Sequence, residues 1–202
     1  MKKLSLVFIL ALAFATAARA DDGGAWINLQ ANFGWDKVYG FARVENRTFN
    51  DFSDREASFL AVGAGYKFGS WFKADLSYEY WDIASGVTFH KAVLTDNATM
   101  TRENLSVSIR QKLELAVNPA NSAKTLTLRT RLRGQYAIPN SHFRPYAMAE
   151  TFNGSAWVRS LYYLGTEIVF GNHSMLDMFY LYHVPAGSAQ EHVIGVGYYF
   201  NF

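Results

Sequence analysis

Apolar and polar side chains alternate at successive positions through most of the chain, which is the period of an extended strand. In residues 71–82 the apolar set of Phe72, Ala74, Leu76, Tyr78 and Tyr80 is interleaved with Lys73, Asp75, Ser77 and Glu79. Segments of this kind predict ten strands, over 24–35, 38–48, 57–68, 71–82, 101–116, 124–136, 145–153, 157–170, 174–184 and 191–202. An eleventh segment, over 86–93, fits the same pattern and would be joined to the next by a turn at Thr95-Asp96-Asn97.

The first 20 residues have a different pattern, that of a secretory signal peptide. Lys2 and Lys3 precede an almost unbroken apolar stretch over residues 4–16, and Ala18-Arg19-Ala20 forms a small-x-small cleavage site. The apolar stretch is too short to span a bilayer, and a buried N-terminal helix is the alternative interpretation. We therefore predict a signal peptide over 1–20 and one domain over 21–202. Since the chain has no cysteine, neither a lipidated N-terminus nor a disulfide is expected.

The signal peptide changes the charge balance of the chain. Its removal takes away three of the 19 basic residues and none of the 17 acidic ones, so the mature chain carries a formal charge of −1 instead of +2. A charge this close to zero does not favour nucleic acid as a partner.

Alternation alone also fits a soluble β-sandwich, so three further features decide the fold class. Strands of about ten residues or more match the tilted span of a bilayer. Aromatic residues gather at strand ends, as at Trp35, Trp71 and Phe170, in the manner of interfacial girdles. The signal peptide directs the chain out of the cytoplasm. We predict an all-β protein, a single antiparallel up-and-down transmembrane β-barrel of about 10–12 strands in the outer membrane of a Gram-negative bacterium.

The number of strands follows less directly from the pattern. Bacterial single-chain barrels have an even number of strands, which favours ten or twelve. If the eleventh segment forms a strand, the short links at 69–70, 95–97 and 171–173 fall at one end of the barrel as periplasmic turns, and a twelfth strand is required. Of the two counts we favour twelve.

The last predicted strand carries a specific signal. Ile194, Val196, Tyr198, Phe200 and Phe202 share one face, and the chain stops on the aromatic residue. Tyr198, Phe200 and Phe202 are typical of the C-terminal segment by which outer-membrane barrels are handed to their assembly machinery, although a final core strand could also end in this way. The expected partners are therefore the assembly machinery, together with outer-membrane lipid and lipopolysaccharide around the barrel.

Short motifs run from Thr125 to the C-terminus: Leu128-Arg129-Thr130-Arg131-Leu132, Tyr136-Ala137-Ile138-Pro139, Phe143-Arg144-Pro145-Tyr146 with Glu150, Arg159, Tyr163-Leu164-Gly165, His173-Ser174, Tyr180 and Gly195-Val196-Gly197-Tyr198. Trp26, Gly65-Tyr66-Lys67, Trp71 and Lys73-Ala74-Asp75 extend the set toward the N-terminus. On these residues the chain resembles a family of Gram-negative outer-membrane barrels known only as domain of unknown function 2490, with a poor match over 84–100. The resemblance implies a barrel and no established activity.

Five cations are predicted to line the lumen. Arg129, Arg131 and Arg133 share a face at steps of about 6.6–6.8 Å, and Arg110 and Lys112 on the preceding strand point the same way. We call these five residues the basic ladder. It could guide a small anionic solute through a narrow pore, as charged rings do in channels. It could instead pair with the acidic residues Asp75, Glu79, Glu114, Glu150 and Glu167 and plug the barrel, which we favour because small barrels are filled by their own side chains.

An outer-membrane lipid-modifying enzyme is an alternative from another functional class. It would need a nucleophile and a base in hydrogen-bond contact. The sequence has neither a Gly-x-Ser-x-Gly elbow nor a His-Glu-x-x-His metal motif. Of the histidines His90, His142, His173, His183 and His192, only His173 has an adjacent serine, within a predicted turn. No catalytic residue, metal or cofactor is assigned.

A structural or adhesive barrel is the third possibility, although the loops opposite the predicted turns, around 49–56, 84–86, 117–123, 154–156 and 185–190, are short for protein binding. The sequence therefore leads to a small outer-membrane barrel that is largely filled by its own side chains, with at most a narrow channel for small anionic solutes as the leading hypothesis for its function.

Overall fold

The computed structural model describes residues 23–49, 54–154, 159–185 and 190–202. The predicted signal peptide lies outside these residues, as do parts of three predicted loops. Eleven strands make up the described chain: β1 (Gly23–Trp35), β2 (Val38–Phe49), β3 (Asp54–Lys67), β4 (Phe72–Ile83), β5 (Thr88–Arg102), β6 (Leu105–Val117), β7 (Lys124–Tyr136), β8 (Phe143–Gly154), β9 (Arg159–Phe170), β10 (Ser174–Pro185) and β11 (Glu191–Asn201). None of the described residues belongs to a helix of the length and apolar character needed to cross a bilayer.

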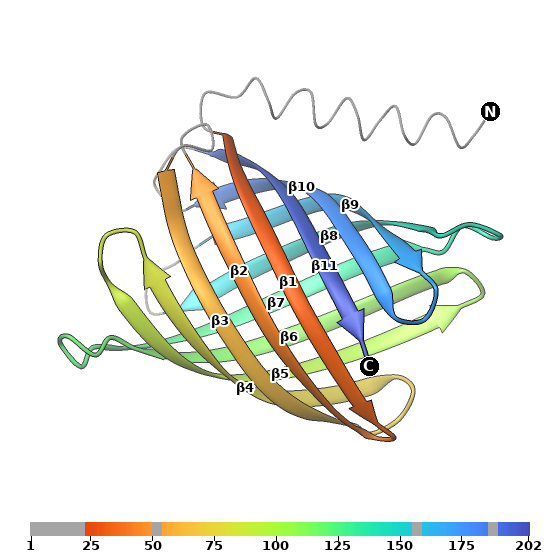
Figure 1. Cartoon of the computed structure of the whole chain (residues 1–202), viewed down its shortest axis with the longest axis horizontal. Helices are drawn as coiled ribbons and strands as arrows, with labels where there is room; N and C mark the ends of the chain where they lie inside the picture. Colours follow the sequence, from red (N-terminus) through yellow and green to blue (C-terminus); the bar gives the residue numbers. More distant parts are fainter. Residues whose placement is uncertain (1–22, 50–53, 155–158, 186–189) are drawn as a thin grey trace.

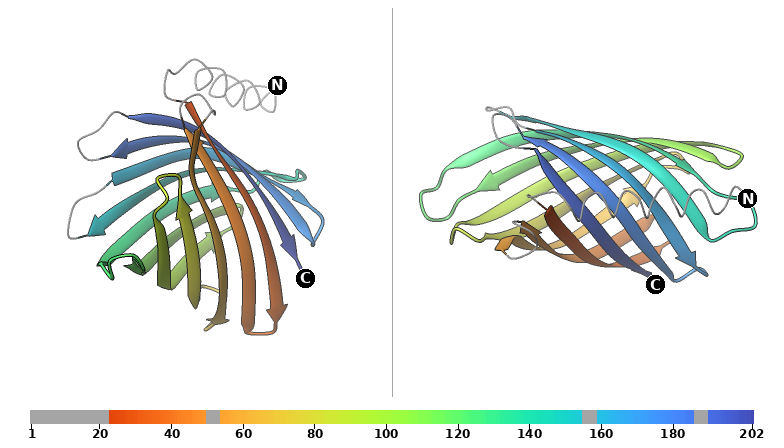
Figure 2. Two further views of the ribbon diagram at one scale, coloured as in Figure 1. Left: turned by 60° about the vertical axis from the view of Figure 1, so that its left-hand side comes forward. Right: turned by 90° about the horizontal axis from the view of Figure 1, so that it is seen from above.

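Each strand pairs antiparallel with the next, and the sheet closes into a barrel through β1 and β11. These two strands run parallel, from Gly23 opposite His192 to Asn32 opposite Asn201 (Figure 1). Figure 2 shows the strands running obliquely around the closed wall. Since the first and last strands point the same way, Gly23 lies at the end of the barrel opposite Phe202.

The prediction of a closed all-β barrel is confirmed, but the preference for twelve strands is wrong, because the described chain forms eleven. The predicted turn at Thr95-Asp96-Asn97 is also wrong, since these residues lie within β5. The connection to β6 is instead the two-residue turn Glu103-Asn104, where Glu103 adopts a left-handed φ of 54°. The polar run resembles a turn because the alternation is hidden there. Thr95 and Asn97 face the lumen, and the outer position between them is also polar, at Asp96.

The alternation separates an apolar outer face from a polar inner one. In β4, Leu76 and Tyr78 are 63% and 45% exposed, whereas Ser77 and Glu79 are only 6% and 1% exposed. This is the reverse of a soluble protein's pattern, and it is repeated around the wall: 32 large hydrophobic side chains among the described residues are exposed. This distribution is the one expected of a barrel that faces lipid outside and encloses charged groups.

Glycines on the inner face accommodate aromatic side chains of the neighbouring strand. Tyr146 of β8 lies opposite Gly165 of β9, and its hydroxyl donates to Asp177 at 2.9 Å. A Cβ atom added to Gly165 would lie 2.5 Å from Cζ of Tyr146 and 2.8 Å from the backbone oxygen of Met178. The absence of a side chain at this position therefore leaves room for the tyrosine ring against the wall.

Replacing Gly165 with alanine is expected to destabilise the barrel by about 1–3 kcal/mol, because the new methyl group overpacks a ring that a hydrogen bond holds in place. Urea unfolding of the protein in lipid vesicles, followed by tryptophan fluorescence, measures the change. Gly134→Ala is the matched control, since nothing lies within 4 Å of its added Cβ. Equal stability of the two variants would contradict this role for Gly165.

Candidate functional site

Glu150 of β8 lies at the centre of an ion-pair network inside the barrel. Register places Arg110 of β6, Arg131 of β7 and Glu150 in one row across three strands, all on the inner face. The carboxylate, 1% exposed, lies 2.7 Å from Arg110, 3.1 Å from Arg129 and 3.7 Å from Arg131. Three guanidinium groups therefore share one buried carboxylate.

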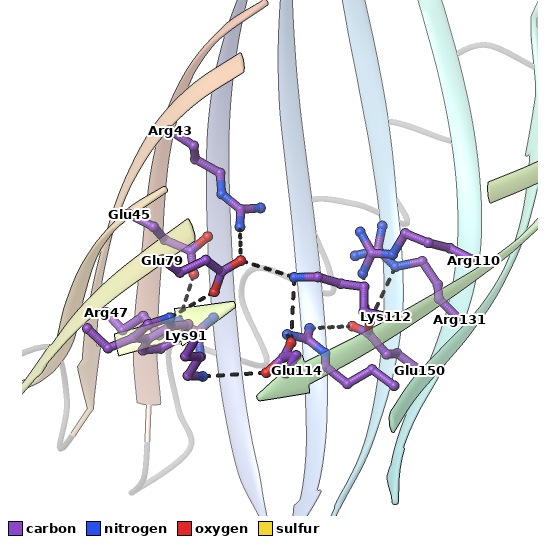
Figure 3. A network of polar contacts seen from close by, with 12 residues as sticks. Arg43, Glu45, Arg47, Glu79, Lys91, Arg110, Lys112, Glu114, Arg131 and Glu150 are labelled. Carbon is purple, nitrogen blue, oxygen red and sulfur yellow. Dashed lines mark hydrogen bonds and ion pairs between the residues drawn. The ribbon is translucent and has the colours of Figure 1, made fainter. Parts of the chain in front are cut away.

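The network continues around the wall through Lys112, whose Nζ lies 3.2 Å from Glu79 and 3.5 Å from Glu114 (Figure 3). Glu114 also pairs with Arg129 at 2.7 Å and with Lys91 at 3.5 Å. Cations and carboxylates thus alternate from β4 to β8. Because an unpaired charge in a confined interior is costly, this alternation is what lets so many charges be buried together.

The remaining predicted site residues lie near this network but are bound separately. Arg133 pairs with Glu167 at 2.6 Å. Asp75 accepts a hydrogen bond from the Tyr39 hydroxyl at 2.9 Å, and within the described part of the chain it forms no ion pair with the ladder. The structure therefore brings together four of the five predicted acids with the basic ladder, and leaves Asp75 with a tyrosine.

The sequence prediction missed several charged residues of the lumen, among them Arg43, Glu45, Arg47 and Lys91. Arg43 pairs with Glu79 at 3.2 Å, and Arg47 pairs with Glu45 at 2.7 Å. The signal was present, because residues 43, 45 and 47 of β2 alternate with outward-facing residues in the same way as the arginines of β7.

Aromatic side chains pack the half of the lumen nearest Gly23. One cluster contains Trp26, Phe152 and Tyr163, and another contains Phe59 and Trp81. The Arg47 guanidinium joins them, at 3.8 Å from the ring centroid of Trp26 and 4.9 Å from that of Trp81. These side chains therefore narrow this half of the lumen.

The opposite half, toward Phe202, holds a cavity of about 570 Å³. Its charged lining consists of the cations Arg43, Lys67, Lys73, Arg110, Lys112 and Arg131 and the carboxylates Asp75 and Glu79. A second cavity of about 320 Å³ lies on the side of Trp26 and shares Arg43, Glu79, Arg110, Lys112 and Arg131 with the first. The ion-pair network thus lies where the two cavities meet.

Several guanidinium donors of the network are not used by the protein. The buried Nε atoms of Arg43, Arg110, Arg129, Arg131 and Arg133 have no hydrogen-bond partner among the described residues. Together with the excess of cations around the larger cavity, these donors give the lumen a positive character that the ion pairs do not fully neutralise.

The histidines do not assemble a catalytic group within the described chain. His183 contacts Glu191 at 2.7 Å, His90 and His192 contact tyrosine hydroxyls, and His173 contacts the backbone oxygen of Asn201. None of these contacts is with a serine. The described residues also hold no group of three or more side chains suited to a metal ion.

The C-terminal residues close the barrel beside β1. The Phe202 N–H donates to the Asn32 oxygen at 2.9 Å, and the Phe202 ring stacks on Phe33 with centroids 5.4 Å apart. The Tyr198 and Phe200 rings meet edge to face at 4.7 Å. Recognition of these residues by an assembly machinery stays a prediction.

A family model described as "Protein of unknown function (DUF2490)" matches residues 23–192. None of the curated proteins matches the chain. Among solved structures, the NanC porin is similar with a TM-score of 0.55 and 14% identity over 80% of this chain and 85% of that one. The KdgM porin is similar with a TM-score of 0.52 and 14% identity over 84% and 88% of the two chains. At this identity the likeness is one of fold.

Proposed function

The chain belongs to the DUF2490 family, and we propose that it is a small outer-membrane porin-like barrel that passes small anionic solutes by a narrow, positively charged route. The observation that carries the proposal is the lining of the larger cavity, with six cations and two carboxylates. An anion entering this space exchanges its hydration for fixed positive charge, whereas a cation meets repulsion.

The unused arginine donors support the same conclusion. A guanidinium group offers five N–H donors, and the buried Nε atoms of Arg43, Arg110, Arg129 and Arg133 form neither a hydrogen bond nor an ion pair among the described residues. These unpaired donors add to the positive character of the lumen around the ion pairs.

The proposed location rests on the predicted signal peptide and on the apolar outer face of the barrel. With Phe202 at the periplasmic end, the turns Asp36-Lys37 and Glu103-Asn104 face the periplasm and the aromatic clusters lie toward the cell exterior. Lipopolysaccharide would then surround the end of the barrel at which β1 begins.

Halide influx into vesicles that contain the protein tests the proposal. We expect Lys73→Glu to slow the influx several-fold, because it reverses a charge in the lining of the larger cavity. Lys124→Glu is the matched control, since it makes the same change at the exposed start of β7, outside both cavities. Influx equal to that of protein-free vesicles, or equal influx through the two variants, would contradict an anion route.

A closed structural barrel is the second candidate, and the packing of Trp26, Phe59 and Trp81 favours it. It predicts no halide influx for the wild-type protein while the barrel remains folded in the membrane. The same vesicle measurement therefore separates the two functions.

A further inference from the structure

The apolar outer face is interrupted by a row of polar side chains that runs across four neighbouring strands. Asp96 of β5 lies opposite Gln111 of β6, Gln111 lies opposite Thr130 of β7, and Thr130 lies opposite Thr151 of β8. Neighbouring members are one strand spacing apart, about 4.8 Å. We call these four residues the outer polar row.

Exposed apolar side chains lie both above and below the central members of the row. Ile109 and Leu113 flank Gln111 on β6 and are 43% and 41% exposed. On β7, Leu128 and Leu132 flank Thr130 and are 37% and 56% exposed. The outer polar row therefore lies within the apolar belt and not at its borders, where polar residues are ordinary.

A carboxylate at this depth needs a partner. Asp96, Gln111 and Thr130 form no side-chain hydrogen bond or ion pair with any other described residue. Polar side chains facing hydrocarbon are costly and usually mark a contact or a pathway. Since the row faces away from the lumen, it cannot belong to the solute route proposed above.

We propose that the outer polar row is the contact surface between two copies of this chain in the membrane. This inference rests on the proposed membrane location. Two copies related by a two-fold axis along the membrane normal meet at the same depth, and such an interface is self-complementary. With the axis between β5 and β6, the Gln111 amide of each copy donates to the Asp96 carboxylate of the other.

The chemistry of the row favours a second copy over a lipid. Lipid headgroups lie at the membrane borders and not at the middle of the belt, and an anionic headgroup would be repelled by Asp96. The row instead places an acceptor and a donor on adjacent strands, which are the two halves of a reciprocal hydrogen-bonded pair. Ala74 and Ala98 beside Asp96 are small, so two barrel walls can approach closely there.

Cysteine cross-linking of the full chain in outer membranes tests the proposal. The chain has no cysteine, so every disulfide formed by a single-cysteine variant joins two molecules. We expect Ala98→Cys, beside Asp96, to form disulfide-linked dimers under mild oxidation. Ala31→Cys is the matched control, because it changes the same residue type on the outer face of β1, far around the wall. Cross-linking that is equal at both positions, or a disulfide-linked product with a different protein, would overturn the proposal.

Sedimentation of the purified protein in detergent gives the second measurement. We expect the wild type to sediment as a dimer, and the Asp96→Leu dimer to dissociate several-fold more readily than the wild-type dimer. Asn46→Leu, on the outer face of β2, should leave the association unchanged. Asp96→Leu places an apolar side chain against lipid, and circular dichroism checks that it folds. A wild-type monomer, or unchanged association of Asp96→Leu, refutes the dimer while leaving the proposed anion route intact. If the chain is absent from the membrane fraction, both the dimer and the anion route are refuted.

Discussion

Glu150→Gln is expected to destabilise the barrel by about 3–5 kcal/mol, the cost of leaving buried charges without their partner. The substitution keeps the shape of the side chain and removes only its charge. Arg110, Arg129 and Arg131 then repel one another around a neutral amide, and no other carboxylate pairs with Arg110 or Arg131 among the described residues. Urea unfolding in lipid vesicles, followed by tryptophan fluorescence, measures the loss of stability.

Asp82→Asn is the control for this prediction. Asp82 pairs with Arg55 at 2.7 Å, but the two side chains are 39% and 42% exposed. An exposed pair contributes about 1 kcal/mol or less, so the control should unfold almost as the wild type does. If Glu150→Gln also loses less than about 1 kcal/mol, the charges of the network are solvated and do not depend on Glu150.

Trp81→Ala is expected to raise the conductance of the barrel several-fold. The Trp81 ring stacks on Phe59 at 4.2 Å and lies 3.9 Å from the Lys91 ammonium group, so it narrows the lumen in the half opposite Phe202. Removing it leaves a water-sized gap between the exterior and the ion-pair network. The indole N–H also donates to Glu79 at 2.8 Å, and its loss frees that carboxylate to move.

Single-channel recording in planar bilayers compares Trp81→Ala with Trp71→Ala. Trp71 is 64% exposed and lies at the other end of the barrel, so its removal takes away the same mass without opening the lumen. Its conductance should match that of the wild type. Unchanged conductance of Trp81→Ala would show that the aromatic clusters are not the barrier to flow.

Local pattern was sufficient to predict the strands whose two faces differ most. Residues 124–136 were predicted with the bounds that β7 has, because leucines and arginines alternate over most of that segment, although Thr130 brings a polar residue to its outer face. β5 was divided in two because Asp96 brings a polar residue to the outer face, and local pattern cannot distinguish this from a turn. The residue that obscured the strand also belongs to the outer polar row.

The strand number and the ion pairs depend on relations between strands, which local pattern does not contain. An odd count becomes acceptable once β1 and β11 pair in parallel, a contact between the two ends of the domain. Similarly, the sequence predicted the inner face for Glu150 and Arg110, but only register across β6, β7 and β8 brings them to 2.7 Å. Arg43 and Arg47, by contrast, could have been assigned to the inner face from the alternation of β2 alone.

The reversal potential of the wild-type barrel in a planar bilayer under a KCl gradient shows which ion the lumen prefers. With six cations and two carboxylates around the larger cavity, the current should reverse near the chloride equilibrium potential. A reversal near the potassium equilibrium potential would contradict the account, as would a folded, inserted barrel that carries no current.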